Sequence, residues 1–351
     1  MNKKIAVLYG GRSGEHEVSL RSAEAIMNGL RNIPGYEVLP VFITKEGSWQ
    51  LNGNRVTILA DPEIKGLYIL DGELAGDTVT IDVVFPVLHG TYGEDGTVQG
   101  LLEMAQLPYV GAGVTGSAVG MDKILMKAVL QAFKLPVGEY LWFTNNMWQK
   151  EQNTLITRIE EKLGYPCFVK PANLGSSVGI SKVYNRPQLV RGVEDALQYD
   201  RRVVVEKTLV GREIECSVLG NDEPMASLPG EIIPCNDFYD YRAKYLDERS
   251  ALVIPAELAP EISEKVRQLA VQTFKVLDCA GLARVDFFVN DESKEIWVNE
   301  INTLPGFTTI SMYPKLWEAT GVSFAELLIK LIELAEERFK QKTALKTTFT
   351  L

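Results

Sequence analysis

The stretch ARVDFFVNDESKEIWVNEIN, residues 283–302, contains two short apolar runs interrupted by polar side chains. Both runs predict β-strands, in which alternate residues point to the same side of a sheet. Arg284 and Asp286 therefore share one face of the first strand. If the two strands are neighbours, two carboxylates and an amide oxygen converge beside an arginine. In the second strand, alternation predicts one face with Val298, Glu300 and Asn302, and an opposite face with Trp297, Asn299 and Ile301.

Carboxylate and amide oxygens are the ligands that a hard cation such as Mg²⁺ takes, with nucleotide phosphates and waters completing its octahedral coordination. A cross-strand salt bridge on a solvated face would produce the same residue pattern. The apolar neighbours VDFFV and IWV favour burial, where an unpaired acid is costly. Because a bound cation removes that cost, we predict a metal site formed by Asp286, Glu300 and Asn302.

Upstream, the apolar run IAVLYGG (5–11) is closed by glycines and followed by a helical pattern, which predicts the first βα unit of a parallel sheet. The strand candidates EVLPVFI (37–43) and DVVFPVLHG (82–90) extend this pattern. We therefore expect an α/β fold that begins with a doubly wound parallel-sheet domain over residues 1–118.

Two further domains are expected after the first. A middle domain, residues 119–212, opens with a helix predicted over residues 117–133 and continues with several strands in a row, which favour an antiparallel sheet. A C-terminal domain, residues 213–351, holds the two strands quoted first and the amphipathic stretch VSFAELLIKLIELAEERFK (322–340). Apolar residues recur there at three- and four-residue steps, so we assign this helix to packing.

Composition excludes several function classes. The 351 residues carry a formal net charge of −10 and no lysine or arginine run, whereas nucleic-acid-binding proteins concentrate positive charge on one face. The four cysteines form no CxxC pair and are expected to be reduced core residues. The first apolar run ends after about five residues, too few for a signal peptide, and no stretch approaches the roughly 18 apolar residues of a membrane span. We expect a cytoplasmic enzyme or binding protein without a nucleic-acid or membrane partner.

Two glycine-containing patterns imitate known motifs. GAGVTG (111–116) matches the GxGxxG dinucleotide fingerprint, but only the short PYV precedes it, where the fingerprint needs a sheet strand. GSSVG (175–179) matches the GxSxG elbow of α/β-hydrolases, but no histidine follows it in the chain. We expect neither a nicotinamide site nor an esterase.

Three further residues stand where a ligand can bind. Lys170 ends the strand PCFVK before the loop PANLGSSVG, whose small residues let backbone N–H groups approach a phosphate. His89 opens the glycine-rich HGTYGEDGTVQG at the end of a strand, although a hydrogen-bonded core histidine is the alternative. Glu15 follows GGRSG at a helix start, where capping, worth about 0.3–1 kcal/mol, is the alternative. These residues predict a metal- and nucleotide-using enzyme and leave its substrate open.

Taken together, the motifs resemble those of one family, the D-alanine–D-alanine ligases of the ATP-grasp superfamily. The resemblance extends over all three predicted domains, in the family's order. It implies an ATP-grasp fold with an α+β middle domain, in which the middle and C-terminal domains clasp ATP and the N-terminal domain contributes to the D-alanine sites. The matching segments are GGRSGEHEVSLRS, VFPVLHGTYGEDGTVQGLLE, GSAVGMDK, FVKPANLGSSVGISKV, EKTLVGREIECSVLG, FYDYRAKY, ARVDFF and VNEINTLPGFTTISMYP.

The resemblance also implies roles for residues that contact the nucleotide and the metal. Lys123 and Lys170 match the phosphate-binding lysines of the family. The metal ligands of the family match the same three residues that the strand faces predicted, Asp286, Glu300 and Asn302. The residues that match the adenine- and ribose-binding stretch are Glu206, Lys207, Leu209 and Glu213.

A second group of residues matches the family's D-alanine sites. Arg284 and the backbone of Gly306 match the groups that stabilise the tetrahedral oxyanion, and His89 lies near the first D-alanine. Lys244 matches a lysine on the loop that closes over the phosphates. Glu15 is implied to anchor the ammonium group of the first D-alanine, in a hydrogen-bonded network with Ser176 and Tyr245. Ser311 and Met312 are implied to hold the carboxylate of the second.

The activity that the resemblance implies is ATP-dependent ligation of two D-alanine molecules through a D-alanyl phosphate, for peptidoglycan precursors. It implies ATP as co-substrate, two Mg²⁺ ions or Mn²⁺, a cytoplasmic location and a homodimer. The alternatives are a D-alanine–D-serine or D-alanine–D-lactate ligase, against which Tyr245 and Met312 argue, and a non-catalytic nucleotide or amino-acid sensor, which would not need Arg284. The acceptor of the attacking amine's proton stays open between the Ser176–Tyr245 pair and the transferred phosphate.

Overall fold

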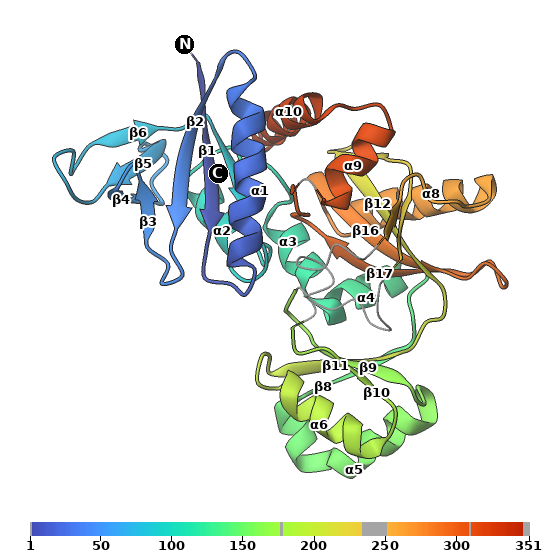
Figure 1. Ribbon diagram of the computed structural model, residues 1–351. Coiled ribbons are helices and arrows are strands. Elements are labelled where there is room, and N and C mark those ends of the chain that lie inside the picture. The colour runs from blue at the N-terminus through green and yellow to red at the C-terminus, as the bar shows by residue number, and fades with distance from the viewer. Residues whose placement is uncertain (1, 176–177, 234–250, 309, 347–351) are drawn as a thin grey trace.

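The computed structural model describes residues 2–175, 178–233, 251–308 and 310–346. Within these residues the chain forms three β-sheets, which follow one another along the sequence. Figure 1 shows the first sheet beside the third, with the second sheet and its helices below them. The mixture of parallel and antiparallel sheets with helices confirms the predicted α/β class.

The first sheet has the strand order β6-β5-β4-β3-β2-β1-β7. β2, β1 and β7 are parallel, as predicted for the first three strands. The other strands continue the sheet in antiparallel fashion, which the sequence did not reveal because they are only three to five residues long. The strands are β1 (Lys3–Gly10), β2 (Tyr36–Ile43), β3 (Trp49–Leu51), β4 (Asn54–Ile58), β5 (Gly66–Ile69), β6 (Thr78–Thr80) and β7 (Val83–Val87).

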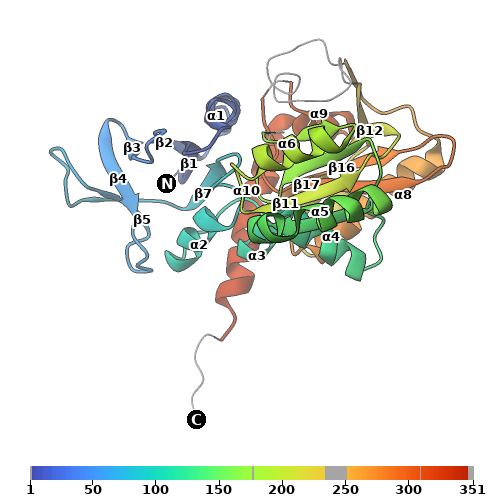
Figure 2. The same cartoon turned by 90° about the horizontal axis from the view of Figure 1, so that it is seen from below.

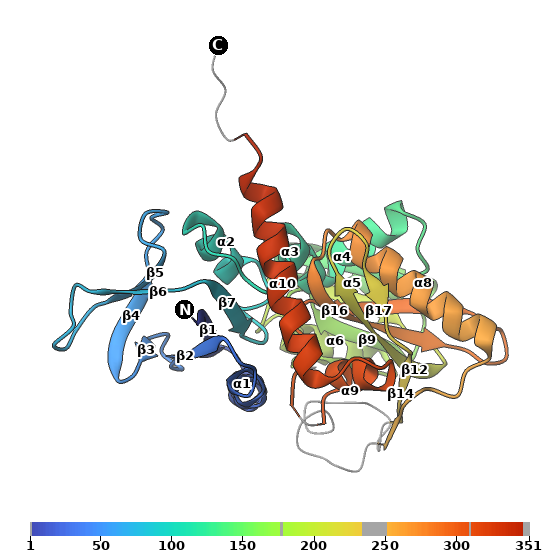
Figure 3. The same cartoon turned by 90° about the horizontal axis from the view of Figure 1, so that it is seen from above.

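Helices cover both faces of this sheet, so the doubly wound arrangement is confirmed. Ile5 packs in one core with α1 (His16–Arg31) and α10 (Phe324–Thr343), whereas its neighbour Ala6 packs in another with α2 (Thr97–Met104). Figure 3 shows α10 between the first and third sheets. The predicted amphipathic helix therefore packs against the N-terminal sheet, far from it in sequence.

The second sheet is antiparallel, in the order β10-β9-β11-β8, as the run of consecutive strands predicted. α5 and α6 cover one face, with Trp148 and Leu189 in the shared core (Figure 2). On the other face, Ile124 contacts Ala172 and Val204. The elements are β8 (Tyr140–Thr144), α5 (Asn145–Lys162), β9 (Cys167–Pro171), β10 (Ser181–Val183), α6 (Arg186–Ala196) and β11 (Arg202–Lys207).

The single helix predicted over residues 117–133 is wrong. The chain forms two helices there, α3 (Val114–Met121) and α4 (Lys123–Ala132), separated by Asp122. Asp122 has an extended backbone with ψ 103°, and its Oδ1 accepts hydrogen bonds from two backbone N–H groups of α4, both at 3.1 Å. An N-cap aspartate of this kind begins a new helix, so Lys123 becomes the first residue of α4.

The third sheet has the order β15-β14-β12-β16-β17, with β13 paired to β12. All its pairings are antiparallel. Phe274 of α8 lies in the core beneath this sheet with Val285 of β16. The elements are β12 (Arg212–Gly220), β13 (Met225–Ala226), β14 (Gly230–Ile233), β15 (Ala251–Val253), α8 (Pro260–Val276), β16 (Gly281–Val289), β17 (Ile296–Asn302) and α9 (Met312–Ala319).

The predicted alternation of faces in β17 is wrong in its first half. Glu300 and Asn302 do lie opposite the polar residues of β16, but Val298 and Ile301 are both buried in the core beneath the sheet. The register shows why, since β17 carries Asn299 as an extra residue between two paired positions. A β-bulge of this kind reverses the alternation of side chains, so the apolar and the polar residues each reach their own face.

The cysteines fit the prediction as far as the structure describes them. Cys167, Cys216 and Cys279 are free and buried, and burial raises the pKa of the Cys167 thiol to about 11. Cys235 lies outside the described residues. Across the described ranges, none of the helices combines the length and the apolar character that crossing a membrane would need.

The packing of α10 on the first sheet gives a stability prediction. Leu331 is fully buried between them, so Leu331→Ala should lower the free energy of unfolding by about 2–5 kcal/mol through lost contacts and a cavity. Leu345, which is 68% exposed just after the same helix, is the control, and Leu345→Ala should change it by less than about 0.5 kcal/mol. Urea unfolding followed by circular dichroism measures both. Equal effects would mean that α10 does not hold the N-terminal sheet.

Candidate active site

A cleft of about 540 Å³ opens between the second and third sheets and reaches the N-terminal loops. Its size is that of a small-molecule site. Most of the residues that the sequence predicted for the site line this cleft, although they come from all three sheet regions. Those that do are Glu15, Lys123, Lys170, Glu206, Lys207, Leu209, Glu213, Arg284, Asp286, Glu300, Asn302, Gly306, Ser311 and Met312.

A row of three acids crosses the third sheet on the cleft side. Glu215 of β12 pairs with Asp286 of β16, which pairs in turn with Glu300 of β17. Residues directly opposite one another on neighbouring strands share a face and lie close together. Two register positions along, and so on the same face, Arg284 pairs with Asn302. The prediction that these polar groups converge from adjacent strands is therefore confirmed by the register.

Arg284 is held by two of these acids. Its Nε and Nη2 donate to the two carboxylate oxygens of Asp286, each at 2.6 Å. Its Nε also lies 2.8 Å from Oε2 of Glu215. Glu215 was missed in the sequence analysis, although it stands two residues after Glu213 on one strand and so faces the same side. The guanidinium supplies part of the positive charge that the acids need.

The donor set suits a hard cation but is incomplete as a metal site. Among the residues that the structure describes, no three histidine, cysteine, aspartate or glutamate side chains are grouped to hold a metal ion. Asp286 and Glu300 supply carboxylate oxygens and Asn302 supplies an amide oxygen, which are ligands that Mg²⁺ accepts. Mg²⁺ is usually bound by one or two carboxylates together with substrate phosphates. The residues present therefore fit a magnesium site that a bound nucleotide completes.

The opposite wall of the cleft carries lysines. Lys123 donates from Nζ to the backbone oxygen of Leu174 at 2.6 Å, and Lys170 lies with Nζ 2.7 Å from Oε2 of Glu206. The other oxygen of Glu206 lies 3.2 Å from Nζ of Lys127. Burial acts to raise the pKa of Glu206, but Lys127 and Lys170 outweigh it and lower this pKa to about 2. The Glu206 carboxylate is thus charged and shared by two ammonium groups.

Lys127 is a second residue that the sequence analysis missed. It follows Lys123 by four positions on α4, so the two side chains lie on the same side of the helix. The available signal was a lysine repeated at helical spacing in the segment MDKILMK.

Glu15 stands at the N-cap position of α1, where its charge suits the helix dipole, but its side chain makes no capping hydrogen bond. Its carboxylate lies at the cleft, where a Cβ added at Gly175 would meet Oε1 at 2.6 Å. Glu94, a further cleft residue that the sequence analysis did not single out, is also buried nearby. Burial, followed by the charge of Glu15, raises the pKa of Glu94 well above its usual value.

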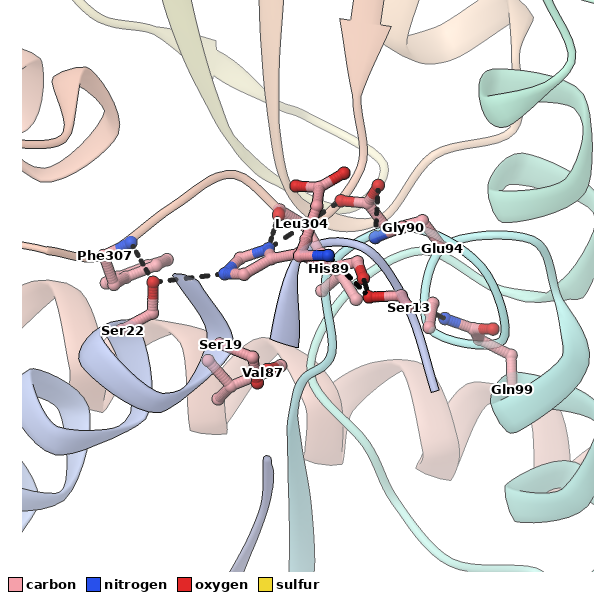
Figure 4. A network of polar contacts seen from close by, with 12 residues as sticks. Ser13, Ser19, Ser22, Val87, His89, Gly90, Glu94, Gln99, Leu304 and Phe307 are labelled. Carbon is pink, nitrogen blue, oxygen red and sulfur yellow. Dashed lines mark hydrogen bonds and ion pairs between the residues drawn. The ribbon is translucent and has the colours of Figure 1, made fainter. Parts of the chain in front are cut away.

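His89 lies outside the residues that line the cleft. Figure 4 shows its ring between Leu304 and Ser22, with Nδ1 2.9 Å from the Leu304 oxygen and Nε2 3.1 Å from the Ser22 Oγ. Ser22 Oγ also accepts from the backbone N–H of Phe307 at 3.2 Å. Burial lowers the pKa of His89. The structure thus agrees with the core-histidine alternative, and His89 with Ser22 holds the loop that contains Gly306.

The loop before α9 completes the cleft. Ser311 Oγ accepts from the backbone N–H of Thr308 at 3.0 Å and lies 2.8 Å from its Oγ1. A Cβ added at Gly306 would come within 2.8 Å of the Ser311 hydroxyl, so a larger residue here would displace that hydroxyl. Met312 is buried and begins α9. Three predicted residues, Ser176, Lys244 and Tyr245, lie outside the described residues.

Two family models match the chain. The model described as D-ala D-ala ligase N-terminus matches residues 4–112, and the model described as D-ala D-ala ligase C-terminus matches residues 129–333. Together they span both the first sheet and the two sheets that form the cleft.

Relatives and solved structures agree with these models. A protein from Natranaerobius thermophilus called D-alanine–D-alanine ligase is 50% identical, over 99% of this chain and 98% of the relative. The structure of the D-alanine-D-alanine ligase from Coxiella burnetii has a TM-score of 0.86 at 38% identity, over 98% of this chain and 96% of that one. The VanG D-Ala:D-Ser ligase from Enterococcus faecalis has a TM-score of 0.85 at 36% identity, over 95% and 100%. The fold is therefore the ATP-grasp fold of these ligases, and the chain belongs to the D-ala D-ala ligase family.

Proposed function

We propose that the cleft binds ATP along its lysine-bearing wall and two D-alanine molecules beside Arg284, and joins them by way of a D-alanyl phosphate. Membership of the family makes the protein an ATP-dependent ligase that forms D-alanyl-D-alanine for cell-wall precursors. The observation that supports the residue roles is that one cleft holds both the lysines and the row of acids with Arg284.

In the first step, a carboxylate oxygen of the first D-alanine attacks the γ-phosphorus of ATP, and the bond to the bridging oxygen breaks to release ADP. Lys123 and Lys170 are proposed to bind the phosphates, and Glu15 the ammonium group of this D-alanine. The residues proposed to lie against adenine and ribose also line the cleft: Glu206, Lys207, Leu209 and Glu213. Positive side chains promote such a transfer by neutralising charge on the phosphoryl oxygens.

Asp286, Glu300 and Asn302 are proposed to hold two Mg²⁺ ions, or Mn²⁺ in their place. When bound, such ions neutralise negative charge on the phosphates during transfer. The two strands that carry these ligands are paired, so their backbones hold the three side chains on one face of the sheet. Without an ion, both oxygens of Asp286 accept hydrogen bonds from Arg284.

In the second step, the neutral amine of the second D-alanine attacks the acyl phosphate carbon. A C–N bond forms, the C–O bond to phosphate breaks, and the amine gives up a proton either to the departing phosphate or to the Ser176–Tyr245 pair. Arg284 and the backbone N–H of Gly306 are proposed to stabilise the oxyanion, an interaction worth about 3–4 kcal/mol per donor. Ser311 and Met312 are proposed to hold the carboxylate of the attacking D-alanine. His89 is proposed to act from behind the cleft, through the loop that contains Gly306.

For the residues outside the described ranges, Ser176, Lys244 and Tyr245, the roles implied by the resemblance stay proposals. We also propose the domain division 1–118, 119–212 and 213–351, a cytoplasmic homodimer, and no nucleic-acid or membrane partner. The sequence charge of −10 supports the absence of a nucleic-acid partner.

The role of Arg284 predicts a large loss of rate in a protein that still folds, with a lower free energy of unfolding because Asp286 and Glu215 lose a cationic partner. Arg284→Ala should lower kcat by at least about 100-fold, because the oxyanion loses a charged donor. Arg191→Ala, at an exposed position on α6, is the control and should leave kcat unchanged. Phosphate release from ATP with D-alanine measures turnover, and circular dichroism checks folding. Near-normal turnover of folded Arg284→Ala would remove Arg284 from the mechanism.

The choice of second substrate can be measured directly. The rate of phosphate release with D-alanine alone should be substantially higher than the additional rate that D-serine or D-lactate causes when it is added to D-alanine. Chromatography of the products identifies the dipeptide or depsipeptide formed. A predominant D-alanyl-D-serine product would favour the D-Ala:D-Ser activity for which the VanG ligase is named.

The proposed metal ligands predict a strict requirement for a divalent cation. Removal of divalent cations with EDTA should abolish phosphate release, and added Mg²⁺ or Mn²⁺ should restore it. In the Asp286→Asn variant, one carboxylate becomes an amide, so Mn²⁺ titration followed by electron paramagnetic resonance should show weaker binding in the presence of ATP. Unchanged Mn²⁺ binding in this variant would exclude Asp286 as a ligand.

A further inference from the structure

Lys127 is a buried lysine behind the nucleotide wall of the cleft. Its side chain is 2% exposed and is not among the residues that line the cleft. Its Nζ lies 3.2 Å from Oε1 of Glu206 and 5.9 Å from the centre of the Tyr140 ring. A lysine is almost never fully buried unless it is paired, so its position calls for an explanation beyond packing.

The partner of Lys127 is also the partner of a cleft residue. Oε2 of Glu206 lies 2.7 Å from Nζ of Lys170, and Lys170 lines the cleft. One carboxylate therefore balances two ammonium groups, and this cluster carries an excess of one positive charge. Lys170 lines the cleft, whereas Lys127 lies behind the cleft wall. Lys170 is therefore the lysine whose ammonium group can turn toward a ligand.

We propose that Lys127 is a positioning residue that keeps Glu206 paired when a nucleotide phosphate draws Lys170 toward itself. The inference rests on the proposed function, in which Lys170 binds a phosphate of ATP. A buried carboxylate left without a cation is strongly unfavourable. With Lys127 in place, the Lys170 ammonium can bind the phosphate while Glu206 keeps a cationic partner, so that cost is avoided.

A purely structural role predicts different behaviour. In the nucleotide-free protein, Glu206 keeps Lys170 as its cationic partner even without Lys127, so the loss of Lys127 leaves no unpaired carboxylate at this position. The loss of Lys127 should therefore matter mainly once a nucleotide binds. If Lys127 were only structural, its loss would lower stability without nucleotide and leave affinity for ATP unchanged.

The first experiment compares ATP binding with stability in the full-length protein, with Mg²⁺ and without D-alanine. In Lys127→Met, the Kd for ATP, measured by calorimetry, should rise by about tenfold or more. The melting temperature without nucleotide should stay close to that of the wild type, and the increase that ATP causes should shrink. Lys127→Arg, which keeps the charge, should restore most of the affinity. Lys150→Met, at an exposed position on α5, is the control and should change neither quantity.

The second experiment asks whether Lys127 acts through Glu206. In a Glu206→Gln background the buried carboxylate is gone, so adding Lys127→Met should cost less affinity for ATP than it does in the wild type. If Lys127→Met does not fold, Lys127→Gln replaces it in both experiments. The KM for D-alanine should stay within about twofold in every folded Lys127 variant, because the lysine lies away from the amino-acid sites.

Three outcomes would overturn the proposal. Unchanged affinity for ATP in Lys127→Met, with or without a lower melting temperature, would leave Lys127 a structural residue. An equal loss of affinity in the Glu206→Gln background would mean that Lys127 acts on the nucleotide without Glu206. A wild-type protein that does not bind ATP would instead contradict the proposed function, on which the inference depends.

Discussion

The need to balance buried charge governs the arrangement of this site. Glu215, Asp286 and Glu300 lie side by side on three paired strands, where their mutual repulsion and their loss of water are both unfavourable. Arg284 lies against two of them and offsets part of this cost. The remaining negative charge suits the divalent cations and the triphosphate that we propose for this face of the sheet.

The lysine-bearing wall that faces this sheet also balances buried charge, but there the excess charge is positive. Lys127 and Lys170 share Glu206, which leaves an excess of positive charge next to the cleft. Each of these three charged groups nevertheless has a partner of opposite charge. The N-terminal loops close the third side, and the ring of His89 joins them to the backbone at Leu304. Because α10 packs on the first sheet and contacts β12 and β16, it joins the N-terminal sheet to the acidic wall.

Much of the fold and site could be predicted because the signals are local. The parallel strands, the antiparallel second sheet and the polar positions of β16 follow from alternation and turn residues in short stretches. Two features could not be predicted. At Asp122 the helical periodicity of the sequence continues through the break between the two helices. At Asn299 a single extra residue interrupts the alternation of the strand. Glu215 and Lys127 were missed because each acts through a partner that is distant in sequence.

The sequence by itself determined the family, the class of fold and the residue types of the site. These follow from motifs and periodicities within short segments, in which oxygen donors, lysines and glycines indicate the kind of ligand that can bind. Only the tertiary structure decided which charges share a partner, which face each residue of β17 reaches, and that His89 lies behind the cleft. The physical reason is that pairing and burial depend on distances between separate segments, whereas periodicity reports only on neighbours along the chain.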